Sequence, residues 1–374
     1  MANILILIGA HLCTAPRPQK EATALAEAGH RVVARGVWFD PALVERDRAL
    51  MATAPYQFAP VLDFRPGRPE RLGVRLQARL ARLAFQRWQR FSPSLLGYGA
   101  KAMLRVALQE RADLTIVHSE AGLWVGDRLL QRGYRVGVDF EDWFSHDLLP
   151  SAQRIRPVQQ LKQLEAQLMQ HCGYCLTTSE ALAATLAQVY QAPKPTVIYN
   201  AFPSASSSTS SSTSSGTSFS TSSEEVGFRD RPARSLPSIH WFSHTIGPGR
   251  GLETLCQALP LLSVPVEIHL RGNCSEQTRQ WLESQTPPEW RSRLFIHPTV
   301  PNGELPARIA EHDIGLALEL TDPPSRNLTV TNKLFQYLQA GLAVIATDTA
   351  GQREILSQCP AAGRLIPSND PQAL

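Results

Sequence analysis

Residues 329–341 contain the pattern with the clearest chemical meaning. They read T-V-T-N-K-L-F-Q-Y-L-Q-A-G, and the apolar run A-V-I-A-T-D follows. Thr331 or Asn332 can cap a helix that begins here, which puts Lys333 in its first turn. The helix dipole favours acids rather than cations at this end. The lysine therefore indicates an anion bound beside the helix, with an exposed surface lysine as the alternative interpretation.

A second candidate follows the apolar segment 238–242, where the chain reads S-H-T-I-G-P-G-R-G-L-E-T-L. A glycine-rich turn that opens a helix can hold phosphate oxygens on its backbone N–H groups, and Arg250 can bind a diphosphate through two hydrogen bonds. The turn is neither a Walker loop nor G-x-G-x-x-G, because the spacing of Gly247, Gly249 and Gly251 differs. The three glycines can also serve the turn alone.

These candidates require a scaffold, and the chain supplies one in which short apolar segments alternate with amphipathic stretches. The expected strands are residues 4–8, 31–34, 114–117, 136–140, 174–177, 196–199, 238–242, 266–270, 294–297, 314–318 and 343–347. The expected helices include residues 17–28, 158–169, 251–259, 305–311 and 332–339. This rhythm predicts the α/β class, with two doubly wound, Rossmann-like parallel-sheet domains facing across a cleft.

Residues 204–223 are almost wholly Ser and Thr, and such a run cannot bury enough apolar surface to offset its ordering entropy. We therefore expect a first domain over residues 1–203, a flexible insertion and linker over 204–236, and a second domain over 237–374. The last residues, I-P-S-N-D-P-Q-A-L, are typical of a helix start. Because no helix follows, the second domain is expected to be truncated.

Composition excludes several classes of protein. Hydrophobic residues make up 43% and charged residues 19% of the 374, as in a globular protein, and a net charge of +4 is too small to indicate a nucleic-acid partner. No apolar run is long enough for a membrane span, and the start lacks the pattern of a secretory signal.

The six scattered cysteines indicate a reducing compartment. Cys172 and Cys175 form a C-x-x-C, but the remaining ligands of a zinc site are missing.

Residues 70–91 predict a basic amphipathic helix with two possible roles. In one, its leucines face the core and its arginines are solvated; in the other, it contacts an anionic membrane. One flank carries Leu72, Leu76, Leu80 and Leu83. The adjacent flank carries Arg71, Arg75, Arg79 and Arg82, and the helix closes with the aromatic residues Trp88 and Phe91.

The run N-K-L-F-Q-Y-L-Q-A-G-L-A-V-I-A-T-D, with G-Q-R-E-I after it, resembles the donor segment of GT-B fold glycosyltransferases, specifically the retaining family 4, or group 1. Arg250-Gly251 and V-P-N-G-E-L-P-A-R-I-A-E-H-D match further family segments. Four segments in the first half also resemble the family: A-P-R-P-Q-K-E, V-D-F-E-D-W-F, T-T-S-E-A-L-A and V-I-Y-N-A-F-P. The resemblance implies acceptor binding by residues 1–203 and donor binding by residues 237–374, without a metal or cofactor.

The resemblance implies that cations stabilise a leaving nucleotide diphosphate, and the expected catalytic residues are Arg250 and Lys333. The expected donor-binding residues are Thr245, Gly247, Gly249, Gly251, Gly272, Glu319, Thr331, Asn332 and Gln336. Polar residues at the ends of predicted parallel strands or in the next turn are expected to face the acceptor. They are Arg17, His118, Glu120, Asp139 and Glu141.

Two positions depart from the family pattern. Its E-x7-E pair would fall at Leu328 and Gln336, and the histidine of its D-x-H-E is replaced by Phe140. The leading hypothesis is a cytoplasmic glycosyltransferase of polysaccharide or cell-envelope biosynthesis, peripheral at the inner face of the membrane, that moves a sugar from a nucleotide sugar to a glycan or lipid-linked acceptor. The alternatives are a degenerate protein that binds a nucleotide or glycan without turnover, and a sugar-nucleotide epimerase.

Overall fold

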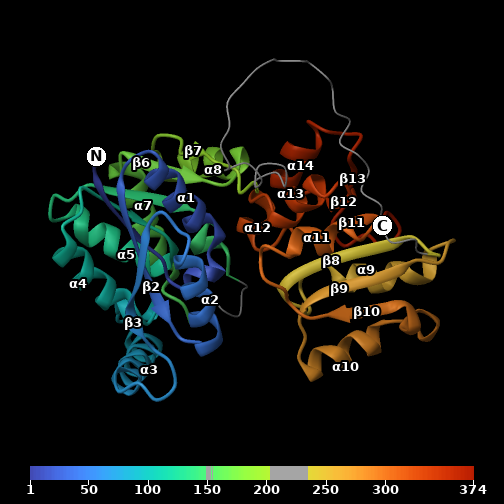
Figure 1. Ribbon diagram of the computed structural model, residues 1–374, viewed down its shortest axis with the longest axis horizontal. Coiled ribbons are helices and arrows are strands. Elements are labelled where there is room, and N and C mark those ends of the chain that lie inside the picture. The colour runs from blue at the N-terminus through green and yellow to red at the C-terminus, as the bar shows by residue number, and fades with distance from the viewer. Residues whose placement is uncertain (149–152, 154, 203–234) are drawn as a thin grey trace, which may run out of the picture. The chain divides into compact units, whose positions relative to one another are not determined.

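The computed structural model describes residues 1–148, 153, 155–202 and 235–374, and it divides into two compact α/β units (Figure 1). Unit 1 comprises Met1–Tyr199 and Asp322–Thr329, and unit 2 comprises Asn200–Thr321 and Val330–Leu374. The Ser/Thr tract at 204–223 lies outside the described residues. Each unit contains one parallel sheet, so the predicted fold class of two doubly wound domains is confirmed.

The sheet of unit 1 has seven strands in the order β3-β2-β1-β4-β5-β6-β7. All of its strand pairs are parallel. The order reverses direction beside β1, and the ends of β1 and β4 therefore flank the switch point where such sheets usually bind ligands. The strands are β1 (Asn3–Leu7), β2 (Arg31–Trp38), β3 (Gln57–Asp63), β4 (Leu114–Val117), β5 (Val136–Phe140), β6 (Tyr174–Thr177) and β7 (Thr196–Val197).

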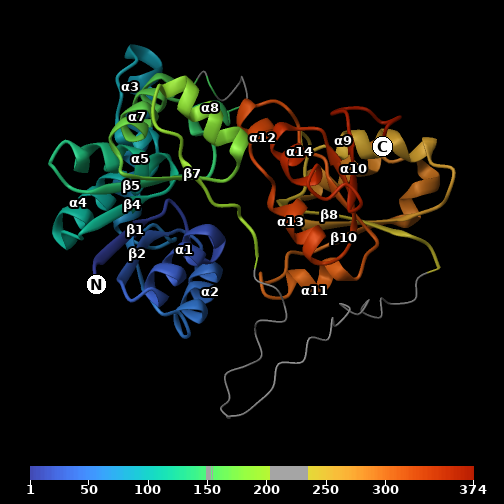
Figure 2. The same ribbon diagram turned by 90° about the horizontal axis from the view of Figure 1, so that it is seen from above.

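Helices cover both faces of this sheet, as Figure 2 shows: α1 and α2 lie on one side, and α5 and α7 on the other. All five residues of β5 are buried, and its sequence is accordingly apolar except for Asp139. The helices are α1 (Pro16–Glu27), α2 (Pro41–Met51), α3 (Glu70–Trp88), α4 (Ala100–Glu110), α5 (Ser119–Leu130), α7 (Val158–His171), α8 (Glu180–Tyr190) and α12 (Pro324–Leu328), with short 3-10 turns η1 (Leu12–Thr14), η2 (Pro93–Leu95) and η3 (Phe144–His146).

Unit 2 contains a six-stranded parallel sheet in the order β10-β9-β8-β11-β12-β13, with its switch point between β8 and β11. The strands are β8 (Ser238–Thr245), β9 (Glu267–Asn273), β10 (Leu294–His297), β11 (Ile314–Ala317), β12 (Ala343–Thr347) and β13 (Gly363–Ile366). The helices are α9 (Leu252–Ala258), α10 (Glu276–Gln285), α11 (Leu305–Ala310), α13 (Asn332–Gln339) and α14 (Ala350–Leu356), with η5 (Leu259–Leu261) and η6 (Pro288–Arg293).

The short helix α12 departs from the expected division of the chain. Residues 322–329 belong to unit 1, although the sequence analysis assigned them to the second domain. Within unit 1, the backbone N–H of Trp143 donates to Ser325 Oγ at 2.9 Å, and Ser179 Oγ donates to the carbonyl of Leu328 at 2.6 Å. The chain therefore leaves unit 2 after β11 and returns to it directly before α13, the helix that carries Lys333.

Candidate functional site

A buried salt bridge joins two of the expected donor-binding elements in unit 2. Lys333 lies in the first turn of α13, and its Nζ is 2.5 Å from Glu319 Oε1, just beyond the end of β11. The residue is 8% exposed, and Nζ lies 5.6 Å from the ring centroid of Trp241 on β8. Thr331 caps α13 by accepting a hydrogen bond from the N–H of Lys333 at 3.4 Å. The ammonium group is thus fixed where α13, β8 and β11 meet.

The glycine-rich loop lies against the same end of β11. Gly251 precedes α9 in the left-handed conformation, with φ +80°. A Cβ atom at Gly251 would lie 2.2 Å from the carbonyl oxygen of Leu318, the residue before Glu319. The loop backbone therefore approaches β11 at a distance that only glycine permits. Through Leu318, the loop and the Lys333–Glu319 pair lie next to each other.

Glu253 fixes the other part of this loop. Its Oε1 accepts a hydrogen bond of 2.6 Å from the N–H of Gly249, whose φ is +74°. One amide expected to face a phosphate is therefore bonded within the loop. The Arg250 side chain is exposed and makes no ion pair or hydrogen bond within the described part of the chain. It is accordingly free to bind an anion.

The remaining donor-side predictions differ in their surroundings. Asn332 Oδ1 accepts a hydrogen bond of 2.7 Å from Asn200 Nδ2, while Thr245 is exposed at the end of β8. A Cβ at Gly272 would lie 2.5 Å from the carbonyl oxygen of Ser243, which explains the glycine by the close approach of β9 and β8. Gln336 is 7% exposed, and its Oε1 has no hydrogen-bond partner among the described residues.

In unit 1, His118 lies between two carboxylates after the end of β4. Its Nδ1 is 2.7 Å from Glu141 Oε1, and its Nε2 is 2.8 Å from Glu21 Oε2. Both ring nitrogens can therefore donate, as an imidazolium does. Burial opposes this charge, but the hydrogen bonds to Glu141 and Glu21 outweigh it and raise the pKa of His118 to about 10. His118 is thus a fixed cation at neutral pH rather than a proton acceptor.

Arg17 and Asp139 form a buried pair beside His118. Arg17 Nε donates to Asp139 Oδ2 at 2.6 Å, and its two terminal nitrogens donate to the carbonyls of Ile198 and Thr177 at 2.5 and 3.2 Å. Burial raises the pKa of Asp139 to about 6, although His118 and Arg17 both act to lower it. Because all its nitrogens are bonded, Arg17 ties α1 to the sheet.

These contacts bring four of the five predicted acceptor-side residues together. Ligand atoms of Glu21, His118 and Asp139 all lie within 4.8 Å of one another, and Glu141 and Arg17 bind members of that group. Glu120 instead forms an ion pair with Arg156. The end of β4 therefore carries a compact polar network, at the switch point that the sheet order defines.

Comparison with known families decides what unit 2 is. Residues 238–374 match the family model described as glycosyl transferases group 1. Residues 238–374 are a glycosyl transferases group 1 domain. The predicted resemblance is therefore confirmed, and the Lys333–Glu319 pair and the Gly251 loop both lie within this glycosyltransferase domain. No curated protein sequence matches the chain.

Solved structures extend the likeness to both units. Sucrose-phosphate synthase from Thermosynechococcus elongatus has a TM-score of 0.67 at 14% identity, covering 100% of this chain and 88% of that one. HepE from Anabaena, in complex with UDP-glucose, has a TM-score of 0.62 at 16% identity, covering 100% and 87%. A putative UDP-N-acetylglucosamine 2-epimerase from Listeria monocytogenes has a TM-score of 0.54 at 9% identity, covering 99% and 85%. The chain thus has the GT-B fold, which both transferases and epimerases adopt.

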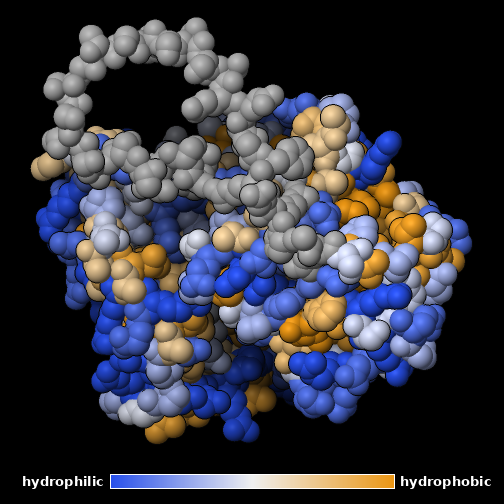
Figure 3. Space-filling model, turned by 45° about the vertical axis from the view of Figure 1, so that its right-hand side comes forward, coloured by the Kyte–Doolittle hydropathy of each residue, from blue (hydrophilic) through white to orange (hydrophobic). Residues whose placement is uncertain are grey.

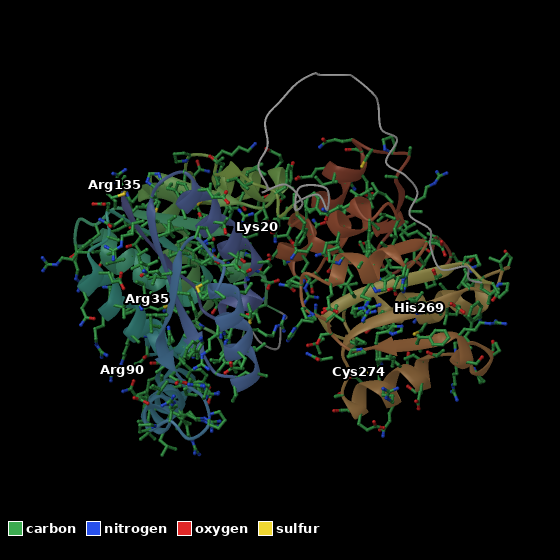
Figure 4. All side chains as sticks on the ribbon, viewed as in Figure 1. Lys20, Arg35, Arg90, Arg135, His269 and Cys274 are labelled. Atoms are coloured by element: carbon green, nitrogen blue, oxygen red, sulfur yellow. The ribbon has the colours of Figure 1, made fainter. Side chains whose placement is uncertain are left out.

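Outside the glycosyltransferase domain, three residues in or beside the unit 1 network were not predicted from the sequence. Glu21 receives hydrogen bonds from His118 and from the hydroxyl of Tyr174, the latter at 2.9 Å. Lys20 lies beside it on α1 (Figure 4), and burial together with the nearby Arg17 lowers its pKa to about 8. The scarcity of lysine, five in the chain, could have directed attention to Lys20. Glu21 and Tyr174 belong to no such rare class.

Two groups of metal-type ligands occur among the described residues, and hydrogen bonding accounts for both. In the Glu21, His118 and Asp139 group, His118 bonds a carboxylate through each ring nitrogen. The second group consists of His11, Cys13 and Asp47. In it, His11 Nε2 accepts hydrogen bonds from two backbone N–H groups, and His11 Nδ1 lies 2.9 Å from Asp47 Oδ2. Neither histidine therefore offers a lone pair to a cation.

The C-x-x-C of unit 1 shows no reactive character. Burial raises the pKa of the Cys172 thiol to about 12, and burial also raises that of Cys175. Cys175 Sγ lies 3.6 Å from the sulfur of Met169, within the core beneath α7. All six cysteines are free thiols. The pair therefore packs in the core, since a reactive cysteine requires a lowered pKa.

Proposed function

We propose that the protein transfers a sugar from a nucleotide diphosphate sugar to a glycan or lipid-linked acceptor, with retention at the anomeric carbon and without a metal. The observation that supports this most strongly is the position of Lys333. Its buried ammonium group lies in the first turn of α13, beside the loop of Gly251 and Arg250, in a group 1 glycosyltransferase domain. A cation in that place complements a bound anion.

The proposed chemistry requires negative charge to be stabilised on a leaving nucleotide diphosphate. An ammonium group has three donors, and Lys333 uses one on Glu319, so two remain for phosphate oxygens. Arg250 can add a bidentate contact from the loop. Donors that are held in place before the reaction avoid the cost of reorganisation, which is why they act more strongly than water does. We assign no side chain as general base and propose that the leaving phosphate takes the acceptor proton.

The proposal also names a donor, an acceptor side and a location in the cell. The HepE structure contains UDP-glucose, so a UDP-linked hexose is the first donor to test. The polar network around His118 and Glu141 is the proposed acceptor side. The proposed location is the cytoplasm, at the inner face of the membrane, and the six free thiols agree with a reducing compartment. None of the helices in the described part of the chain has the length and apolar character needed to cross a bilayer.

Thermal unfolding in the presence of UDP, GDP, ADP and their sugars tests the donor first. A nucleotide that binds only the folded protein raises its unfolding temperature. The stabilising nucleotide sugar is then incubated with the protein, release or transfer of the sugar is followed by mass spectrometry, and the anomeric configuration of the product is assigned by NMR. Product that retains the anomeric configuration is the expected result. If no nucleotide binds and no sugar is released, the proposal is wrong.

One observation favours a second candidate, a protein that binds nucleotides without turnover. The second acid of the family's pair is replaced by Gln336, which carries no charge, and its buried Oε1 has no hydrogen-bond partner among the described residues. Gln336→Glu separates the two functions, with Gln339→Glu as the control because Gln339 is exposed on the same helix. Higher transfer activity in Gln336→Glu alone supports the transferase. Nucleotide binding without turnover in all three proteins supports the second candidate.

A further inference from the structure

The helix α3 presents its leucines to solvent. Their exposed fractions lie between 52% and 76%, and Trp88 at the end of the helix is 65% exposed. The leucines recur every three or four residues and therefore form one continuous stripe along the helix. The interpretation that they face the core is thus wrong. The exposed leucines are Leu72, Leu76, Leu80 and Leu83.

A different face of α3 attaches it to unit 1. The buried residues of the helix are Ala78, Ala81 and Phe85, which pack with Leu95 and Phe91. At about 100° per residue, this face is roughly opposite the leucine stripe. The leucines therefore add nothing to the core. Contiguous apolar surface of this kind usually marks an interaction site, because exposing it to water is unfavourable.

Arginines border the leucine stripe. Residues 70–90 contain six arginines and a single acid, Glu70, at the first position of the helix. None of the six forms a salt bridge within the described residues; Arg82 donates to the carbonyl of Ala78, Arg71 lies over the ring of Phe64, and Arg90 follows the end of the helix (Figure 4). In Figure 3, hydrophobic and hydrophilic side chains alternate at the lower end of unit 1, where Figure 1 shows α3. The six are Arg71, Arg75, Arg79, Arg82, Arg87 and Arg90.

The charges decide between the possible occupants of this face. A second copy of the chain would bring two sets of unpaired arginines together, which is unfavourable. An anionic bilayer supplies both components that the helix lacks, acyl chains for the leucines and phosphates for the arginines. Trp88 also suits the boundary between headgroups and acyl chains, where tryptophan is enriched. The helix is 19 residues long, or about 28 Å, and can lie along such a surface.

We propose that α3 is a docking surface for a membrane rich in anionic lipid. The helix lies in the plane of the headgroups, with the leucines among the acyl chains and the arginines on lipid phosphates. This inference does not depend on the proposed transferase activity, because it rests on the exposed stripe and the unpaired charges of unit 1 alone. Membrane binding is therefore measured without a donor or acceptor.

Vesicle flotation with the full chain tests the proposal. The protein is mixed with vesicles of phosphatidylcholine alone or of phosphatidylcholine with phosphatidylglycerol. We expect flotation only with the anionic vesicles and less of it at high salt, because phosphate contacts by arginine are screened. Leu76→Ser with Leu80→Ser, and separately Arg75→Gln with Arg79→Gln, are each expected to weaken partitioning by roughly tenfold or more.

Matched variants keep the result specific to α3. Arg46→Gln with Arg105→Gln removes the same charge from exposed positions elsewhere in unit 1, and Leu261→Ser changes a leucine that is 50% exposed. Both are expected to float like the unaltered protein, and circular dichroism checks that every variant is folded. Equal flotation of all variants, or none by the unaltered protein, overturns the proposal. A dimer in light scattering that Leu76→Ser abolishes would identify a second copy as the occupant and also overturn it.

Discussion

Lys333 Nζ and Glu319 Oε1 lie 2.5 Å apart, although 14 residues separate them in the sequence and the chain passes through unit 1 between them. The pair is largely buried, with side-chain exposures of 10% and 19%. Two charges in such a place attract strongly, but burial costs each its hydration, so the pair alone is weak evidence of a stabilising role. Its position at the start of α13 fits a cation held ready for a ligand.

Lys333→Ala is therefore expected to lower the affinity for the nucleotide that binds, by about ten- to a hundredfold, because hydrogen bonds to charged groups contribute about 1.5–3 kcal/mol. Isothermal titration calorimetry measures the change. The control is Lys194→Ala, since Lys194 is 52% exposed and pairs with Glu180 on unit 1. Unchanged affinity in Lys333→Ala, with the variant folded, would remove Lys333 from the donor site.

Gly251→Ala tests the contact between the glycine loop and β11. A side chain there meets the carbonyl of Leu318 and needs a backbone with φ +80°, so we expect a loss of about 2 kcal/mol or more in the free energy of unfolding. Gly247→Ala is the control, because nothing lies within 4 Å of its added Cβ. Thermal unfolding, with hydrogen exchange in residues 314–318, locates the effect. Equal melting of the two variants would contradict the close approach.

The central strands could be predicted from the sequence because each is a short apolar run buried on both faces. The central strands β4, β5, β6 and β12 have the expected bounds, as does β10 at the edge of the second sheet. The edge strands β3 and β13 were missed, since β3 contains Pro60 and β13 contains Arg364, and neither is an apolar run. The helices named from the sequence do not include α5, whose two glycines lower its helix propensity. At Gly126 a Cβ would lie 3.0 Å from Leu168, so close packing explains that residue.

The candidate site could be predicted only where chemistry and spacing coincide. Lys333 was found because a lysine is unusual in the first turn of a helix. Glu21 was not, because a carboxylate on an amphipathic helix is common and its contact with His118 spans 97 residues of sequence. Likewise, the periodicity of α3 places its leucines on one flank and its arginines on the next, but does not show which face of the helix is buried. The buried face is set by the contact of Phe85 and Ala81 with Leu95, a tertiary contact that periodicity does not contain.

His118 makes the stability of unit 1 depend on alkaline pH. Its pKa is about 10 in the folded chain and 6.5 in its ordinary state, so the folded state holds the proton more tightly. The resulting stabilisation is complete below pH 6.5 and is lost as the pH rises from 6.5 to about 10. We therefore expect the unfolding temperature of the protein to fall over this range.

The variant His118→Gln is expected to lose about 3 kcal/mol of stability at pH 6, because it leaves the buried carboxylate of Glu21 and the partly exposed carboxylate of Glu141 without their cation. Its unfolding temperature should also change less between pH 6.5 and 10. Differential scanning calorimetry across this range measures both effects. His171→Gln serves as the control, since His171 is exposed. A variant curve parallel to that of the unaltered protein would show that His118 does not carry the proton.

His240 makes unit 2 sensitive to pH in the opposite direction. It is fully buried on β8, and neither ring nitrogen has a hydrogen-bond partner among the described residues. Aromatic rings surround it, with that of His312 at 4.4 Å and that of Phe242 at 5.8 Å between centroids. Burial, followed by the charges of His312 and Arg271, lowers its pKa well below 6.5. The folded state therefore keeps His240 neutral.

Below pH 6.5 the unfolded chain accepts a proton at His240, whereas the folded chain keeps this residue neutral. The free energy of unfolding is therefore not reduced by His240 above pH 6.5. Below pH 6.5 the free energy of unfolding declines by about 1.4 kcal/mol per pH unit as the pH falls toward the lowered pKa of His240. His240→Leu removes both the titration and two unsatisfied polar atoms. We expect it to raise stability at pH 5 more than at pH 7 in urea denaturation, while His171→Gln changes neither. A variant destabilised equally at both values would mean that His240 acts through its shape rather than its charge.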